Sequence, residues 1–243
     1  TQLNEQLEAE VSRLQAQIIE LQQQNSELEV LSALLDFARK DVNLVAVSGG
    51  DGTVQAVLTA LFQNRPFENF PLLTLLQSGT ASMTARDVGF LGSPVRALHK
   101  LYRWAQTGDG KPRTVKRPVL RVAAPGHPIR YGMFFGAAVI YQGIEYFHRN
   151  VNGRGFRGEI GPGLTILRFL WALVNKNKDF TASVPLTVQL DQDPATQFDC
   201  LVVLISTLER LLLGMHPYWG REKGALHYTA VKAGPRHLLR ALP

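Results

Sequence analysis

The segment Leu44–Thr53, LVAVSGGDGT, constrains the fold more than any other part of the chain. Its apolar first half, residues 44–47, is followed at once by a glycine-rich half, residues 48–53. An apolar run bounded by glycines predicts a buried strand of a parallel sheet, and the apolar spacing of residues 54–62 predicts a helix that begins at the same turn. Glycines let a ligand approach the backbone closely, and a helix N-terminus attracts anions. The segment therefore predicts a phosphate-binding turn between a strand and a helix.

Asp51 stands in the middle of this turn. A carboxylate repels phosphate unless a divalent cation or a transferable proton lies between them. Asp51 therefore indicates a nucleotide-phosphate site at which a reaction takes place. The glycines alone leave a second interpretation open, in which the segment is an ordinary strand-to-helix turn of an α/β protein. As a turn former only, Asp51 could be replaced by Asn with little effect on stability.

The five residues GGDGT, 49–53, resemble the nucleotide-binding signature shared by diacylglycerol and sphingosine kinases and by NAD kinases. A second segment, Leu75–Gly89, is similar to the lipid kinases, in which a strand ends in Gly-Thr and an amphipathic helix follows. The positions that match are Gly79, Thr80, Met83, Thr84, Ala85 and Arg86, with Ser82 where Asn is usual. NAD kinase is the weaker alternative, because its Asn-Glu and downstream Asp pattern is not seen after residue 80. The resemblance covers roughly residues 30–243.

The resemblance to lipid kinases implies an activity and a set of site residues. It implies transfer of the γ-phosphate of ATP to the hydroxyl of a lipid such as diacylglycerol, with Mg²⁺ as the metal. Asp51 would ligate Mg²⁺ and receive the hydroxyl proton. The residues implied in nucleotide binding are Gly49, Gly50, Gly52, Thr53, Gly79, Thr80 and Ser82. A lipid kinase would act in the cytoplasm, peripherally at a membrane.

The chain departs from the lipid-kinase pattern at both ends. The family normally begins with a strand that bears an Asn-Pro-x-Ser-Gly phosphate loop, followed by a helix and a second strand, and none of these is present here ahead of the strand that leads into GGDGT. The pair Lys223-Gly224 stands where an Asp-Gly pair is expected, and the chain stops at Pro243, before an expected Asp-Gly-Glu strand. We therefore expect a lipid-kinase body that is truncated at both ends. A non-catalytic scaffold that retains the kinase fold is the competing interpretation.

Residues 1–35 carry a regular heptad repeat. Leucines recur every seven residues at the d positions 7, 14, 21, 28 and 35, and the a positions are Asn4, Val11, Ile18, Asn25 and Ser32. β-branched residues at a with leucine at d favour a parallel two-stranded coiled coil, and a buried Asn at an a position fixes register. The repeat therefore predicts a homodimer. The alternative is a single amphipathic helix packed on its own domain.

These patterns divide the chain into three predicted parts. Residues 1–40 form the coiled-coil helix, and residues 41–115 an α/β nucleotide-binding lobe with a strand at 72–76 and helices at 81–87 and 94–107. Residues 116–243 form a β-sandwich substrate lobe, because β-like runs separated by Pro and Gly dominate there. These runs are 119–124, 129–139, 182–190, 200–206 and 225–232, and one helix, 163–174, interrupts them.

Composition limits the partners. Residues 1–41 hold eight acidic and three basic residues, whereas residues 42–243 hold 12 acidic and 23 basic ones. This cationic body favours anionic partners, and the basic and aromatic residues between Arg149 and Lys178 predict contact with an anionic membrane surface. No nucleic-acid-binding motif accompanies the charge, so a nucleic-acid partner is not expected. The single cysteine, Cys200, lies in an apolar run and predicts a buried thiol.

Overall fold

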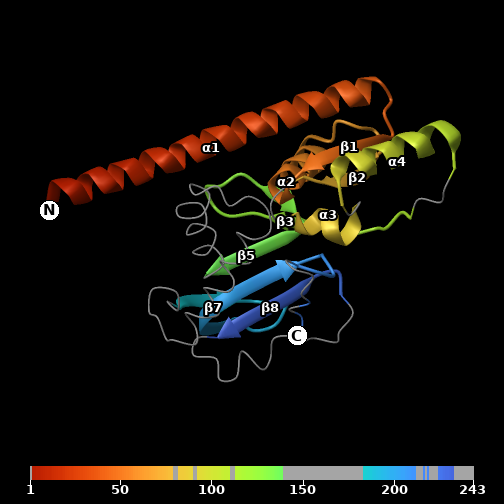
Figure 1. Ribbon diagram of the computed structural model, residues 1–243. Coiled ribbons are helices and arrows are strands. Elements are labelled where there is room, and N and C mark those ends of the chain that lie inside the picture. The colour runs from red at the N-terminus through yellow and green to blue at the C-terminus, as the bar shows by residue number, and fades with distance from the viewer. Residues whose placement is uncertain are drawn as a thin grey trace.

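The computed structural model describes residues 2–78, 82–89, 92–109, 113–138, 183–211, 216, 218 and 224–232. It is a mixed α/β structure that begins with a long helix, α1 (Gln2–Arg39), and places the helices and the parallel strands above an antiparallel sheet in Figure 1. The predicted helix at 163–174 and the basic and aromatic stretch from Arg149 to Lys178 lie outside the described residues.

The glycine-rich turn joins a parallel strand pair to a helix, as predicted. Strand β1 (Leu44–Gly49) pairs in parallel with β2 (Leu72–Gln77), so that Leu44 lies opposite Leu72 and Gly49 opposite Gln77. Helix α2 (Asp51–Thr59) follows β1 and continues as a π-helical turn, η1 (Ala60–Asn64). After β2 come α3 (Met83–Val88) and α4 (Pro94–Thr107).

The predicted burial of strand β1 holds for one of its two faces. Val45 and Val47 are buried, whereas Ala46 and Ser48, which alternate with them, are exposed. Helix α2 packs against β1 and belongs with both valines to one hydrophobic core. Because successive side chains of a strand point to opposite faces, the structure covers one face of β1 and leaves the other in contact with solvent.

The second half of the chain is antiparallel. A hairpin of β3 (Leu120–Val122) and β4 (Arg130–Gly132) precedes a four-stranded sheet whose centre is β7 (Thr196–Ser206). The other strands of this sheet are β5 (Phe134–Ala138), β6 (Val184–Val188) and β8 (His227–Lys232). The predicted β-runs thus match strands, while the sandwich and the two-lobe arrangement stay predictions.

One hydrophobic core joins the helical part of the chain to segments that flank the antiparallel sheet. Buried residues of α1, β1, α2, β2 and α3 form one cluster with Met133, Leu208 and Leu211. The cluster thus includes residues on both sides of the boundary expected near residue 115, and that boundary stays a prediction. The Cys200 thiol is fully buried, as expected, and burial raises its pKa. No helix in the described part of the chain is long and apolar enough to span a bilayer.

An ion pair joins α3 to the antiparallel half. Arg117 Nε donates to Asp87 Oδ2 at 3.2 Å, and Arg117 Nη1 lies 3.6 Å from Glu209 Oε1. The Asp87 side chain is only 4% exposed, so its charge depends on this partner.

We expect Arg117→Ala to lower the free energy of unfolding by about 1.5–3 kcal/mol, the range for a hydrogen bond to a charged group. The loss leaves the Asp87 carboxylate buried without its guanidinium. Urea denaturation measures the change, and Arg121→Ala, which removes an exposed cation on β3, is the control that should stay within about 0.5 kcal/mol of the unchanged protein. If the two substitutions lower the free energy of unfolding equally, the ion pair between Arg117 and Asp87 does not stabilise the fold as we expect.

Helix α1 uses two different faces. Near its C-terminal end, Val30, Leu31, Leu34 and Phe37 pack against the core, and Arg130 of β4 forms an ion pair with Glu27. The heptad positions Val11, Leu14, Ile18, Leu21, Leu28 and Leu35 instead remain 39–65% exposed. Figure 1 shows the N-terminal half of the helix extending past the body. Packing on the body therefore leaves the apolar heptad stripe uncovered, and coiled-coil pairing stays a prediction.

Candidate active site

The glycine-rich turn lies at the carboxyl ends of β1 and β2, where the two hydroxyl oxygens of Ser48 and Ser78 are 3.1 Å apart. Gly50 is the N-cap of α2, and the first hydrogen bond of the helix runs from Val54 N to Gly50 O, at 3.1 Å. The backbone N–H groups of residues 51–53 therefore have no acceptor within the helix. These groups and the positive end of the helix dipole can receive an anion at the turn.

The Asp51 carboxylate is held by the N-terminus of another helix, α3. Its Oδ2 accepts from Met83 N at 2.9 Å, and its Oδ1 accepts from Thr84 N and Thr84 Oγ1, both at 2.8 Å. Ser82, the N-cap residue of α3, has a left-handed backbone (φ 44°, ψ 42°) and makes no side-chain cap hydrogen bond. Asp51 therefore caps α3 from a position 33 residues before Thr84 in the chain, in a role that the sequence did not predict.

These hydrogen bonds leave limited capacity on Asp51. Each carboxylate oxygen has two lone-pair sites. Oδ1 uses both of its sites on Thr84, whereas Oδ2 uses one of its two on Met83. Oδ2 can therefore accept a metal ion or a proton while the carboxylate still holds α3. The described residues contain no group of three or more His, Cys, Asp or Glu side chains that could form a complete protein cage for a metal.

The residues present fit Mg²⁺ bound together with a nucleotide. Mg²⁺ in nucleotide sites commonly has one or two protein carboxylates and completes its shell with phosphate oxygens and water. One free lone pair on Asp51 beside an anion-receiving helix N-terminus meets this requirement. Asp51 is the carboxylate that would hold Mg²⁺ at this turn.

Two glycines of the turn differ in the room that their surroundings leave for a side chain. A Cβ built on Gly49 would lie 2.4 Å from Thr53 Oγ1, so packing of Thr53 over the turn already requires glycine at position 49. A Cβ built on Gly52 would meet no atom of the described residues within 4 Å, and Gly52 is exposed in the first turn of α2. The structure therefore leaves open space at Gly52, next to the free N–H groups of the helix.

The other site residues predicted from the sequence have different outcomes. Ser82 is 1% exposed, so its side chain lies inside the fold. Gly79, Thr80 and Lys223 lie outside the described residues. Two further residues had no predicted role. Thr84 is buried and bonds to Asp51. At Gly89, a Cβ would lie 2.5 Å from Leu75 O, so the packing requires glycine there. Both belong to the segment 75–89, so its resemblance to lipid kinases was the only signal for them.

A hollow of about 270 Å³ lies elsewhere, on the antiparallel sheet. Its lining includes Phe198, Tyr228 and Lys232, and none of the predicted site residues. Burial raises the pKa of the Tyr228 hydroxyl, which stays protonated at neutral pH. Asp193 and Lys232 line the hollow, but it contains no helix N-terminus and none of the predicted site residues, so the turn at residues 49–53 remains the candidate site.

The strand pair, the turn and the capped helix define a class of α/β protein with an anion-receiving turn. Residues 1–109 match the family described as the diacylglycerol kinase catalytic domain. The resemblance predicted from GGDGT is therefore confirmed, and it holds for residues 1–109, less than half of the chain. Comparison with curated proteins gave no match.

Solved structures with a similar fold come from Bacillus anthracis strain Sterne. Two are described as a "putative diacylglycerol kinase", with TM-scores of 0.55 and 0.51 and 19% identity, and one as a diacylglycerol kinase, with a TM-score of 0.52 and 21% identity. Each likeness covers 84% of this chain and 58%, 60% and 59% of the respective structures. The chain thus spans about three fifths of their length, and at these identities the likeness concerns the fold.

Proposed function

We propose that this protein is an ATP-dependent lipid kinase that transfers the γ-phosphate to the hydroxyl of a diacylglycerol-like lipid. The observation that carries the proposal is the position of Asp51. Its carboxylate is fixed by three hydrogen bonds beside an open helix N-terminus and keeps one lone pair free. The match to the diacylglycerol kinase catalytic domain supports the same substrate class.

The proposed roles follow from the geometry of the turn. The N–H groups of residues 51–53 and the Thr53 hydroxyl would bind phosphate oxygens, and the open space at Gly52 would admit them. Asp51 Oδ2 would receive the proton of the lipid hydroxyl while the hydroxyl oxygen bonds to the γ-phosphorus, the bond from that phosphorus to the β–γ bridging oxygen breaks, and ADP leaves. The same free lone pair of Asp51 could instead hold Mg²⁺, which would neutralise charge on the phosphates.

The remaining predicted residues have weaker roles in the proposal. Gly79 and Thr80 would close the far side of the nucleotide, on the resemblance alone. Because Ser82 is buried, we assign its side chain to the packing of the loop before α3 and not to contact with nucleotide. We also propose that the protein works as a parallel homodimer through α1, peripherally at a cytoplasmic membrane surface.

The substitution Gly52→Ala tests the proposed phosphate site. We expect it to raise the free energy of unfolding by about 0.5–1 kcal/mol, because Ala is the better helix former. Binding of ATP with Mg²⁺ should nevertheless weaken at least about tenfold, because the new methyl group occupies the space beside the free N–H groups. Isothermal titration calorimetry with and without Mg²⁺, together with thermal unfolding, measures both effects.

The control for this experiment is Gly132→Ala. Gly132 lies on β4, and a Cβ there would meet only Gln55 Cγ at 3.6 Å, so it also has room for a methyl group. ATP affinity should stay unchanged in this variant. If Gly52→Ala binds ATP as tightly as the unchanged protein, the turn does not bind phosphate and the kinase proposal fails.

A non-catalytic scaffold is the second candidate function. The exposed heptad stripe of α1 favours a scaffold, because dimerisation through this helix requires no catalytic activity of the body. Asp51 caps α3 and Gly49 leaves room for Thr53, and a scaffold would need both structural roles without any ligand. A protein that neither binds ATP nor transfers radiolabelled phosphate to diacylglycerol in mixed micelles would support the scaffold.

A further inference from the structure

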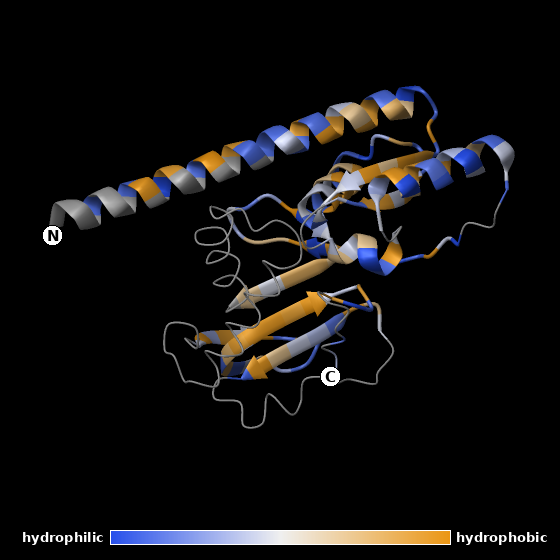
Figure 2. Ribbon diagram, in the orientation of Figure 1, coloured by the Kyte–Doolittle hydropathy of each residue, from blue (hydrophilic) through white to orange (hydrophobic). Residues whose placement is uncertain are grey.

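Helix α4 carries an apolar stripe that the rest of the protein leaves uncovered. Val95, Leu98 and Tyr102 are 63%, 52% and 60% exposed, and their spacing of three and four residues puts them on one face. Ala97 is buried and Leu101 and Trp104 are partly buried, on the side where α4 packs on β2. The apolar arc of the helix is therefore wider than its contact with the body, and Figure 2 shows apolar and polar residues alternating along α4.

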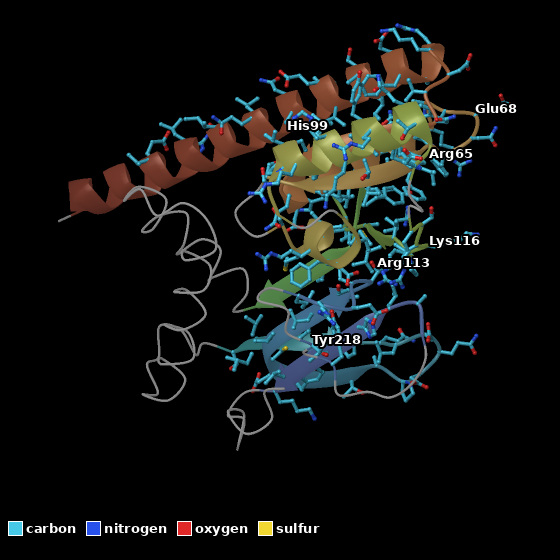
Figure 3. All side chains as sticks on the ribbon, turned by 45° about the vertical axis from the view of Figure 1, so that its right-hand side comes forward. Arg65, Glu68, His99, Arg113, Lys116 and Tyr218 are labelled. Atoms are coloured by element: carbon cyan, nitrogen blue, oxygen red, sulfur yellow. The ribbon has the colours of Figure 1, made fainter. Side chains whose placement is uncertain are left out.

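A second exposed face of α4, next to the apolar stripe, is basic. Arg96, Lys100 and Arg103 are exposed, and α4 contains no Asp or Glu. Within the described part of the chain, none of these three side chains forms an ion pair. His99 is exposed on the same helix, where Figure 3 labels it. Cations that form no ion pair with the described residues thus border one edge of the apolar stripe.

We propose that the outer face of α4 docks the protein on an anionic lipid bilayer, with the helix lying in the plane of the membrane. We call the three apolar and three basic residues together the α4 face: Val95, Arg96, Leu98, Lys100, Tyr102 and Arg103. The proposal rests on the proposed function, since a lipid kinase must reach a substrate that lies in a membrane. It does not depend on the basic stretch at 149–178.

Charge selects a bilayer over a second copy of the chain. A two-fold contact between two α4 helices would bring the same cations of both copies together, which is unfavourable. An anionic bilayer instead offers negative headgroups to the cations and an apolar layer to Val95 and Leu98. The Tyr102 ring suits the boundary between these layers, because its hydroxyl can stay in the polar zone, where it accepts a hydrogen bond from Gln106 Nε2.

The test is binding of the full chain to vesicles by co-sedimentation, without ATP. We expect binding to phosphatidylcholine vesicles that contain phosphatidylserine, and little binding to phosphatidylcholine alone. The triple substitution Arg96→Gln, Lys100→Gln and Arg103→Gln should weaken binding about a hundredfold, since each cation near an anionic surface contributes roughly fivefold. Leu98→Ser with Tyr102→Ser should weaken it at least about tenfold at unchanged charge.

The matched control removes three exposed cations elsewhere. Arg121→Gln, Arg210→Gln and Lys232→Gln change the net charge equally but lie on β3, after β7 and on β8. Equal losses in the two triple variants would mean general attraction by the cationic body and would overturn the proposal. A change of oligomeric state in Leu98→Ser with Tyr102→Ser, with vesicle binding retained, would make α4 a protein interface and would also overturn it.

Vesicle binding and catalysis can fail separately. If the unchanged protein binds anionic vesicles through α4 but does not bind ATP, the membrane proposal stands and the kinase proposal fails. If the α4 variants phosphorylate a short-chain, water-soluble diacylglycerol normally but lose activity on vesicles, both stand. Normal vesicle binding by the α4 triple variant overturns the membrane proposal whatever the activity.

Discussion

Asp51→Asn is expected to lower lipid phosphorylation by at least about a hundredfold, the lower end for loss of a general base. Asn has no charge to attract Mg²⁺ and cannot take a proton at neutral pH. The rate of phosphate transfer to diacylglycerol, measured at saturating ATP, reports this effect. Kinase activity that survives in the Asn variant would refute the catalytic assignment.

The same substitution should also destabilise the protein, contrary to what the turn alone suggests. The carboxylate accepts three hydrogen bonds, two on one oxygen and one on the other. An Asn amide can present its oxygen to Thr84, but its NH₂ group then faces the N–H of Met83. Leaving this partly buried donor unsatisfied costs about 1–3 kcal/mol, which for a chain of this size lowers the melting temperature by roughly 2–12 °C.

Thr84→Val separates these two effects. It removes the hydroxyl that donates to Asp51 Oδ1 but keeps the carboxylate and its charge. We expect a loss of about 1 kcal/mol in the free energy of unfolding and less than about a tenfold loss of activity. If Thr84→Val loses as much activity as Asp51→Asn, Asp51 acts on catalysis through the position of α3, not through its own charge.

Disruption of the heptad stripe is expected to give the second large effect. Leu21→Lys with Leu28→Lys should convert a dimer into a monomer, raising the dissociation constant by about four orders of magnitude. The two substitutions remove four leucines from the dimer interface, each worth at least about 1.5 kcal/mol of burial. Both leucines are exposed in the single chain, so the fold of the body should stay intact.

Sedimentation equilibrium measures this change. Ser26→Lys with Ala33→Lys is the control, because it adds the same two charges at exposed positions of α1 outside the a and d stripe. The control should stay dimeric. If the unchanged protein is a monomer at tens of micromolar, the coiled-coil interpretation of the heptads is wrong.

Local sequence was sufficient for most elements of the described fold. The bounds of α4 coincide with the predicted helix 94–107, because Pro94 suits the first helical position and Gly108 ends the helix in a left-handed conformation. The strand at Leu44, the turn and the helix after it follow from residues that are neighbours in the chain. Such features depend on side-chain period and on glycine, both of which can be seen in a few residues.

Only the tertiary structure decided what these elements touch. Asp51 meets Thr84, 33 residues away, and this contact turns a residue of the turn into the cap of another helix. The exposure of Ala46 and Ser48, and of the α4 face, likewise depends on which surfaces distant segments cover. The heptads determined that α1 is a long helix with an apolar stripe, whereas packing of Leu34 on the core determined which face stays free. Periodicity fixes the faces of an element, but long-range packing chooses which of them is buried, because that choice depends on partners far away in the chain.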